Sequence, residues 1–209
     1  MSNIFDSSLR QVLEASASDA PTPGGGSVSA IVGSFGVAMV SMVANLTTGK
    51  EKYKDVEPQV KAILEKTSRI MARLEELVAE DMQVFGKFME ALKMPKDTEE
   101  QKSLRAGKMQ EALKAATDTP MEIARVCLEG LELAAELSSI GNKGAISDVG
   151  VAAYVAEAAL NSVLLSVDIN IPSIKDAEYV DQVQQEKYAL IVKAAQLREK
   201  AVAQVRDRM

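Results

Sequence analysis

The chain has 209 residues, of which 47% are apolar and only 4% aromatic, and its formal net charge is −6. This length predicts one domain, spanning residues 1–209, that can bury a sizeable core. The acidic balance argues against nucleic acid as a partner, because nucleic-acid-binding domains usually present a basic surface.

The chain contains no histidine, and Cys127 is its one cysteine. Ser-His-Asp and Cys-His catalysis, His/Cys metal sites and an internal disulfide are therefore excluded. Carboxylates, lysines, tyrosines or bound water must carry any proton transfer. No metal site is predicted, since no run of carboxylates has the spacing of a calcium loop. Cys127 lies in a helical run and is expected to be a buried thiol, which fits a reducing, cytoplasmic setting.

Hydrophobic periodicity predicts helices along the whole chain and no strand. In chain order, the expected helices cover residues 3–17, 27–47, 56–93, 97–117, 120–139, 147–167 and 177–206. The break between the fourth and the fifth is placed at Pro120, because proline removes a helical hydrogen bond. The sequence therefore predicts an all-α fold, a bundle of long up-and-down helices with two buried apolar helices.

A turn rich in proline and glycine (PTPGGGS) precedes the first apolar helix. Pro23 cannot continue a helix, and Gly24, Gly25 and Gly26 let a ligand approach the backbone closely. Ser27 is expected to be the helix N-cap. The free N–H groups at such a helix start suit an anion or the polar edge of a heterocycle. The turn is not a Walker A loop or a dinucleotide fingerprint, because no Gly-Lys-Ser/Thr follows it and no strand precedes it.

The apolar helix after this turn carries no charge, and the uncharged stretch runs from Ala20 to Gly49. It is longer than the ~20 residues that span a bilayer. Serines, glycines and Asn45 interrupt it, however, and a helix that is apolar all round also suits the centre of a soluble bundle. We therefore expect a buried core helix and no membrane partner.

Asp81 is out of place, because it falls on the apolar stripe of the helix expected over 56–93. A buried carboxylate is costly unless it is paired, and its pKa tends to rise, which suits a general acid or base. The alternative is that Asp81 lies at the edge of the stripe and pairs with a cation such as Lys87. Asp148 is the second candidate; it lies in the first turn of an almost uncharged helix, where stabilising the helix dipole is its alternative role.

Asn45, Asn142, Asn161 and Asn170 occur in apolar or glycine-bearing surroundings. Each is either a hydrogen-bonded structural amide or a group that binds a ligand. Lys50 follows the first apolar helix, where it either complements the C-terminal dipole of that helix or binds a carboxylated ligand.

With these residues in view, the chain resembles the cyclodeaminase/cyclohydrolase family, which comprises the C-terminal domain of formiminotransferase-cyclodeaminase and its stand-alone bacterial relatives. The resemblance covers essentially the whole chain. It rests on PTPGGGSVSA, VANLTTGKEKY, EDMQVFGKFMEALKMPK, PMEIA, GNKGAISDVGVAA and DINIPSIKD. One departure is Val84-Phe85, which stands where family members usually have Ala-Tyr.

The resemblance implies a helical homodimer that binds a folate, polyglutamylated forms included, in a cleft between helices. It implies no metal and no cofactor beyond tetrahydrofolate itself. The glycine turn would lie against the ligand, Asn45 and Asn142 would orient it, and Lys50 and Lys143 would meet its glutamate tail.

The implied reaction is hydrolysis of 5,10-methenyltetrahydrofolate to 10-formyltetrahydrofolate, with Asp81, or failing that Asp148, as the proton shuttle. Two alternatives stay open. One is cyclisation of 5-formiminotetrahydrofolate with release of ammonia; the hydrolase is favoured over it because the chain has no formiminotransferase domain. The other is a non-catalytic helical protein that binds a ligand or a partner.

Overall fold

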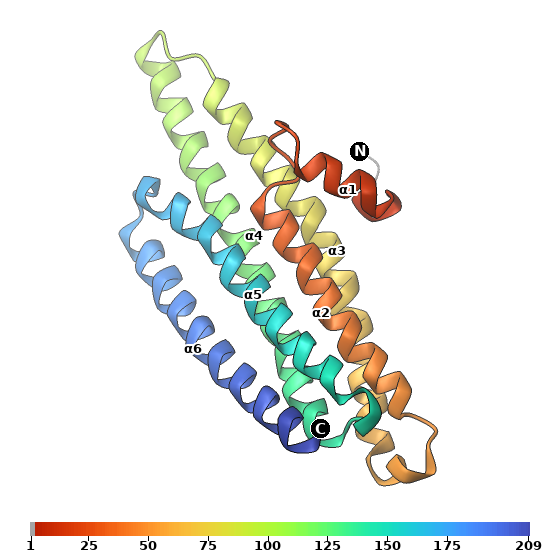
Figure 1. The fold of residues 1–209 in the computed structure, drawn as a ribbon. Helices are drawn as coiled ribbons and strands as arrows, with labels where there is room; N and C mark the ends of the chain where they lie inside the picture. The colour runs from red at the N-terminus through yellow and green to blue at the C-terminus, as the bar shows by residue number, and fades with distance from the viewer. Residues whose placement is uncertain (1–2) are drawn as a thin grey trace.

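The computed structural model describes residues 3–209 and confirms the predicted all-α class, since this part of the chain contains no strand. Five long helices of 23 to 42 residues lie side by side, and a short sixth helix, α1, stands apart near the N-terminus (Figure 1). The long helices are α2 (Gly25–Thr47), α3 (Glu57–Lys93), α4 (Glu99–Ile140), α5 (Ile146–Asn170) and α6 (Ala177–Arg208). The 3-10 turns η2 (Glu51–Val56), η3 (Lys143–Ala145) and η4 (Ile171–Ser173) lie between them.

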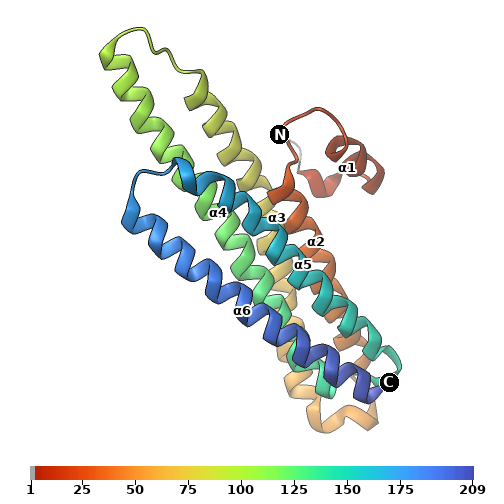
Figure 2. The ribbon, with the colours of Figure 1, turned by 60° about the vertical axis from the view of Figure 1, so that its left-hand side comes forward.

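Small residues bring the central helices close together. A Cβ on Gly36 of α2 would lie 3.3 Å from the backbone nitrogen of Ala156 on α5, and a Cβ on Gly33 would lie 2.7 Å from Cys127 Sγ on α4. Cys127 is buried as predicted, and burial raises the pKa of its thiol to about 12. At one end of the molecule, α3 and α4 extend as a hairpin beyond α5 and α6 (Figure 2).

Helix α2 and the segment from Lys143 to Ser173 are each long and apolar enough to cross a membrane by length and composition. Half of the apolar window of each is buried inside the fold, so the prediction of buried core helices holds for one side of each helix only. The other sides carry exposed apolar side chains, and Val32 of α2 lines one surface groove with Leu165 and Ile169 of α5. These exposed sides of the two helices are here called the α2/α5 face. Its large exposed side chains are Val32, Phe35, Leu46, Val151, Tyr154, Leu165 and Ile169.

The N-terminal segment differs from the single helix expected over 3–17. The 3-10 turn η1 (Ile4–Asp6) comes first, and α1 (Leu9–Ser16) starts again after Ser8, whose side chain accepts a hydrogen bond from the backbone N–H of Gln11 in a capping box. The capping signal of Ser8 therefore interrupts the periodic pattern. No residue of α1 is buried, so its apolar stripe is not covered within one copy of the chain.

The helices expected over 97–117 and 120–139 form one continuous helix, α4, so the predicted break at Pro120 is wrong. Proline lacks an N–H, which leaves the carbonyl of Ala116, one turn earlier, without its helical donor. Asn170 at the end of α5 replaces that donor, because its Nδ2 lies 2.9 Å from the Ala116 carbonyl oxygen. Helix α4 therefore continues through Pro120, and a side chain of another helix supplies the hydrogen-bond donor that proline lacks.

Candidate active site

The start of α2 packs directly on the Asp81 carboxylate of α3. The N-cap is Gly24, not Ser27, and it makes no side-chain capping bond. Ser27 lies in the first turn of the helix, fully buried, and its hydroxyl donates a hydrogen bond to Asp81 Oδ2 at 2.6 Å. The backbone N–H of Ser27 also interacts with this carboxylate. Asp81, on the neighbouring helix α3, thus accepts a hydrogen bond from the first turn of α2, and this helix start does not depend on a local N-cap side chain.

Gly26 is required for this close approach. A Cβ at this position would lie 2.8 Å from Asp81 Cγ and 2.9 Å from Oδ2, and closer still to Oδ1. By contrast, a Cβ on the neighbouring Gly25 would have no atom within 4 Å. Of these two glycines, only Gly26 is fixed by contact with the carboxylate.

The Asp81 carboxyl has the features of a proton-transfer group. Burial raises its pKa above the ordinary value, and the hydrogen bonds from Ser27 act in the opposite direction. Within residues 3–209 no lysine or arginine pairs with it. Lys87, the predicted partner, lines a separate surface groove with Glu90 and Lys108, so the pairing alternative is wrong. The carboxyl group is thus half-buried, without a cation, and hydrogen-bonded only to Ser27 among the described residues.

Asp81 lies in the wall of a cavity of about 390 Å³ between α2, α3, α4 and α5. This volume lies in the range of small-molecule sites. Most of the wall is apolar, and the ring centroids of Phe85 and Phe88 lie 6.4 Å apart in it. Polar side chains are few, which is typical of sites that bind a largely flat, aromatic ligand and fix its orientation at few points. Besides Asp81, the lining polar side chains are Thr22, Ser166, Asn170 and Ser173.

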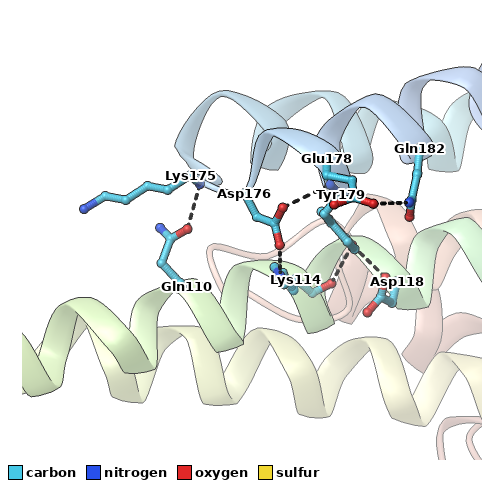
Figure 3. Close-up of polar contacts among 8 residues, drawn as sticks. All are labelled: Gln110, Lys114, Asp118, Lys175, Asp176, Glu178, Tyr179 and Gln182. Carbon is cyan, nitrogen blue, oxygen red and sulfur yellow. Dashed lines mark hydrogen bonds and ion pairs between the residues drawn. The ribbon is translucent and has the colours of Figure 1, made fainter.

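The α5–α6 connection, which carries Ser173, is held against α4 by a set of polar contacts (Figure 3). Gln110 Nε2 donates to the Ser173 carbonyl oxygen at 2.9 Å. Lys114 Nζ lies 2.6 Å from Asp176 Oδ2. These contacts fix one wall of the cavity.

A second polar contact between α4 and α6 lies one turn further along α4. The Tyr179 hydroxyl donates to Asp118 Oδ1 at 2.6 Å. Burial, followed by this contact, raises the pKa of the Tyr179 hydroxyl. The first turn of α6 is thereby tied to α4 beside the cavity (Figure 3).

The predicted site residues fall into two groups at opposite ends of α2 and α5. Of these, Gly24 to Gly26 and Asp81 line the cavity and Ser27 contacts Asp81, whereas Pro23 is buried and does not line it. Pro21 and Thr22, which were not predicted as site residues, also line the cavity. The second group lies near the far ends of α2 and α5. Asp148 is in the first turn of α5, about 27 Å along the helix from Ser166. Its other members are Asn45, Lys50, Asn142 and Lys143.

The side chains of this second group make local contacts or face solvent. Asn142 Nδ2 donates to the Leu46 carbonyl oxygen at 2.7 Å, and its Oδ1 accepts from the Gly144 N–H. Asn45 Nδ2 donates to the Ser41 carbonyl oxygen within α2. Lys50 and Lys143 are exposed. Within one copy of the chain, the structure therefore does not bring this group to Asp81.

Several lining residues did not stand out in the sequence. Phe85, Phe88, Met109 and Leu113 have the spacing of ordinary core positions, so their sequence pattern does not distinguish a cavity wall from a core. Asn170 is different, because it was one of the four asparagines interpreted as either structural amides or ligand-binding groups, and it lines the cavity.

Comparison with known proteins gives consistent results. The family model for formiminotransferase-cyclodeaminase matches residues 8–189. A methenyltetrahydrofolate cyclohydrolase of Methylorubrum extorquens is 41% identical over 201 residues, which cover 96% of this chain and 97% of that protein. The crystal structure of formiminotetrahydrofolate cyclodeaminase from Thermotoga maritima superposes with a TM-score of 0.89 at 30% identity and covers 98% of both chains.

Larger proteins match as well. The formimidoyltransferase-cyclodeaminase of Mus musculus is 31% identical over 174 residues, which are 83% of this chain but only 32% of the mouse protein. The chain thus spans about a third of the length of that protein. A family model covering most of the chain and a relative matched over its full length show that the chain belongs to the formiminotransferase-cyclodeaminase family.

Proposed function

We propose that this protein hydrolyses 5,10-methenyltetrahydrofolate to 10-formyltetrahydrofolate in the cavity beside Asp81. The observation that carries the assignment is the 41% identity, over nearly the full length of both chains, to a methenyltetrahydrofolate cyclohydrolase. The cavity supports it, because its aromatic and aliphatic wall suits a pterin ring and its one carboxylate lacks a cation. The proposal needs no metal and no cofactor besides the folate, and it places the protein, acting as one domain, in the cytoplasm.

In this mechanism Asp81 moves a proton between water and N5. The ionised Asp81 carboxylate takes a proton from a water molecule while the oxygen of that water bonds to the methenyl carbon. The bond between that carbon and N5 then breaks, and Asp81 returns the proton to N5. The remaining hydroxyl proton leaves to solvent as the formyl C=O forms on N10. The loss of this proton accounts for the positive charge that the substrate carried and the product does not. A raised pKa brings the carboxyl closer to the balance between accepting and donating that this role needs.

Cyclodeamination is the second candidate, favoured by the superposition on the Thermotoga maritima cyclodeaminase. There N10 attacks the formimino carbon on N5 and ammonia leaves. Both reactions place a tetrahedral carbon between N5 and N10, so the same carboxyl group could serve either.

Two spectrophotometric assays separate these functions. Loss of the near-ultraviolet absorbance of 5,10-methenyltetrahydrofolate reports hydrolysis, and its gain from 5-formiminotetrahydrofolate with ammonia release reports cyclodeamination. Asp81→Asn should abolish turnover while folate still binds, and Asp97→Asn, in the exposed α3–α4 connection, is the matched control. Full activity of Asp81→Asn would remove it from the mechanism. A folded protein without either activity would favour the non-catalytic alternative.

We also propose that the protein works as a homodimer of up-and-down bundles joined through the α2/α5 face. Large apolar side chains are exposed on two neighbouring helices, which is typical of an interaction site, and twofold pairing is the commonest arrangement of identical chains. A twofold axis at right angles to α2 and α5 would bring Lys50, Lys143 and Asp148 of one copy beside the cavity of the other. This pairing is how the second group of predicted residues could meet a polyglutamate tail.

The dimer is tested by matched charge insertions. Leu165 on the α2/α5 face and Tyr188 on α6 are 68% and 71% exposed. Leu165→Glu should reduce the mass in solution from about 45 kDa to the 22.4 kDa of one chain, whereas Tyr188→Glu should leave it unchanged. A wild-type protein that is already monomeric would refute the dimer.

A further inference from the structure

The orientation of the Asn170 side chain is fixed by the helix that crosses it. The Ala116 carbonyl oxygen, left open by Pro120, can only accept a hydrogen bond, and Nδ2 is the only donor of an asparagine side chain. Nδ2 makes this bond at 2.9 Å. The carboxamide therefore cannot exchange its two ends without placing two oxygens together, and Oδ1 is left for a different partner.

No residue within 3–209 donates a hydrogen bond to Asn170 Oδ1. In particular, Oδ1 does not cap the following turn η4. The side chain is half-buried and lines the same cavity as Asp81. A fixed acceptor without a protein donor thus lies in a mostly apolar wall.

We infer that Asn170 orients the bound folate by accepting a hydrogen bond at Oδ1 from an N–H group of the pterin ring. The inference rests on the proposed function. A reduced pterin carries N–H donors on its ring and on its amino group. The neighbouring lining residues Ala116, Pro120 and Ile169 offer no side-chain acceptor, and the hydroxyls of Ser166 and Ser173 rotate and can donate as well as accept. A fixed acceptor at this point of the wall discriminates against ligands without the matching donor, because the acceptor would lose its water without gaining a partner.

A simple Asn170→Ala variant would confuse two roles, because it also removes the donor to Ala116. The structure offers a way to separate them. Pro120→Ala restores a backbone N–H at position 120, so α4 can satisfy the Ala116 carbonyl itself. The Ala116 carbonyl oxygen has two lone pairs, so in this background it can still hold Asn170 Nδ2 in place. Asn170→Ala then no longer leaves this carbonyl without a donor, and the main change is the lost contact with the ligand. All comparisons are therefore made between Pro120→Ala and the double variant.

We expect the double variant to unfold at the temperature of Pro120→Ala, with a KM for 5,10-methenyltetrahydrofolate that is about tenfold higher and a smaller change in kcat. Tenfold is the usual worth of one hydrogen bond in binding. A purely structural asparagine would instead lower the unfolding temperature of the single Asn170→Ala variant and leave KM unchanged in the Pro120→Ala background. An unchanged KM overturns the inference.

The same variants distinguish this inference from the proposed function. If the wild-type protein turns over 5,10-methenyltetrahydrofolate and the double variant keeps its KM, only the role of Asn170 fails. If the wild-type protein binds tetrahydrofolate without turning over either substrate, the catalytic proposal fails, and the dissociation constant of tetrahydrofolate replaces KM with the same tenfold criterion. If the wild-type protein binds no tetrahydrofolate, both fail.

Discussion

Gly26→Ala tests the contact between α2 and the Asp81 carboxylate. The added Cβ would lie 2.8 Å from Asp81 Cγ, whereas ordinary van der Waals contact begins near 3.4 Å. The carboxyl group or the start of α2 must therefore move by at least about 0.6 Å. Such a shift also strains the 2.6 Å hydrogen bond between Ser27 Oγ and Asp81 Oδ2.

The expected cost follows from this overlap. Overpacking a tight contact costs about 1–3 kcal/mol, and a loss of about 2 kcal/mol lowers Tm by about 4–8 °C in a chain of this size. A 1 Å misplacement of a catalytic group costs about 100-fold in rate, so a 0.6 Å displacement of Asp81 should lower kcat by about tenfold or more.

Gly25→Ala is the matched control for stability. It adds the same methyl group one residue earlier in the same turn, where no atom lies within 4 Å, so Tm should stay the same or rise slightly. Thermal unfolding and steady-state kinetics of the variants measure both effects. A Gly26→Ala protein with the Tm and kcat of the wild type would show that the close approach to Asp81 matters for neither folding nor catalysis.

Three further substitutions have defined outcomes. Asp81→Asn should raise Tm at neutral pH, because burial raises the pKa of this carboxyl group and its ionised form destabilises the fold. The gain in Tm should shrink as the pH falls through that pKa, because the wild-type carboxyl group then becomes protonated. Thermal unfolding between about pH 4 and pH 8 measures this change. Tyr179→Phe removes the bond to Asp118 and should lower the free energy of unfolding by about 1 kcal/mol in denaturant titrations. Arg125→Met breaks the two-point pair with Glu186, but both side chains are about two-fifths exposed, so the loss should stay near 0.5–1 kcal/mol and decrease with added salt.

The helices were largely predictable, because their signals are local. Apolar periodicity placed α3 within a residue of its observed bounds and α6 within two. The error at Pro120 has a non-local cause. The donor that keeps α4 continuous is Asn170, which is 54 residues from Ala116, and no pattern around Pro120 indicates it.

The start of α2 shows the same limit. Ser27 is a good N-cap residue, and local signals favour it in that role. Asp81 interacts with the first-turn Ser27 N–H instead, so the helix can begin two residues earlier and the serine hydroxyl is free to bind the carboxylate. The prediction that Asp81 falls on the apolar stripe agrees with its half-buried position beside the cavity, although its proposed partner was wrong.

Which predicted residues share a site depends on how α2 is aligned with its antiparallel neighbours α3 and α5. One contact of α2 with each neighbour is enough to determine this alignment. A Cβ on Gly33 would lie 3.6 Å from Leu74 of α3 and 3.6 Å from Ala159 of α5. Seven residues, about two turns, bring α2 back to Gly26 and take the antiparallel neighbours forward to Asp81 and Ser166. Both residues line the cavity with Gly26. The same counting in the other direction carries α2 toward Asn45 and α5 back toward Asp148, at the far end. Both sets of residues could be singled out from the sequence. Only the alignment of α2 with its two neighbours separates the set that lines the cavity with Asp81 from the set at the far end, which would need a second copy of the chain to reach a cavity.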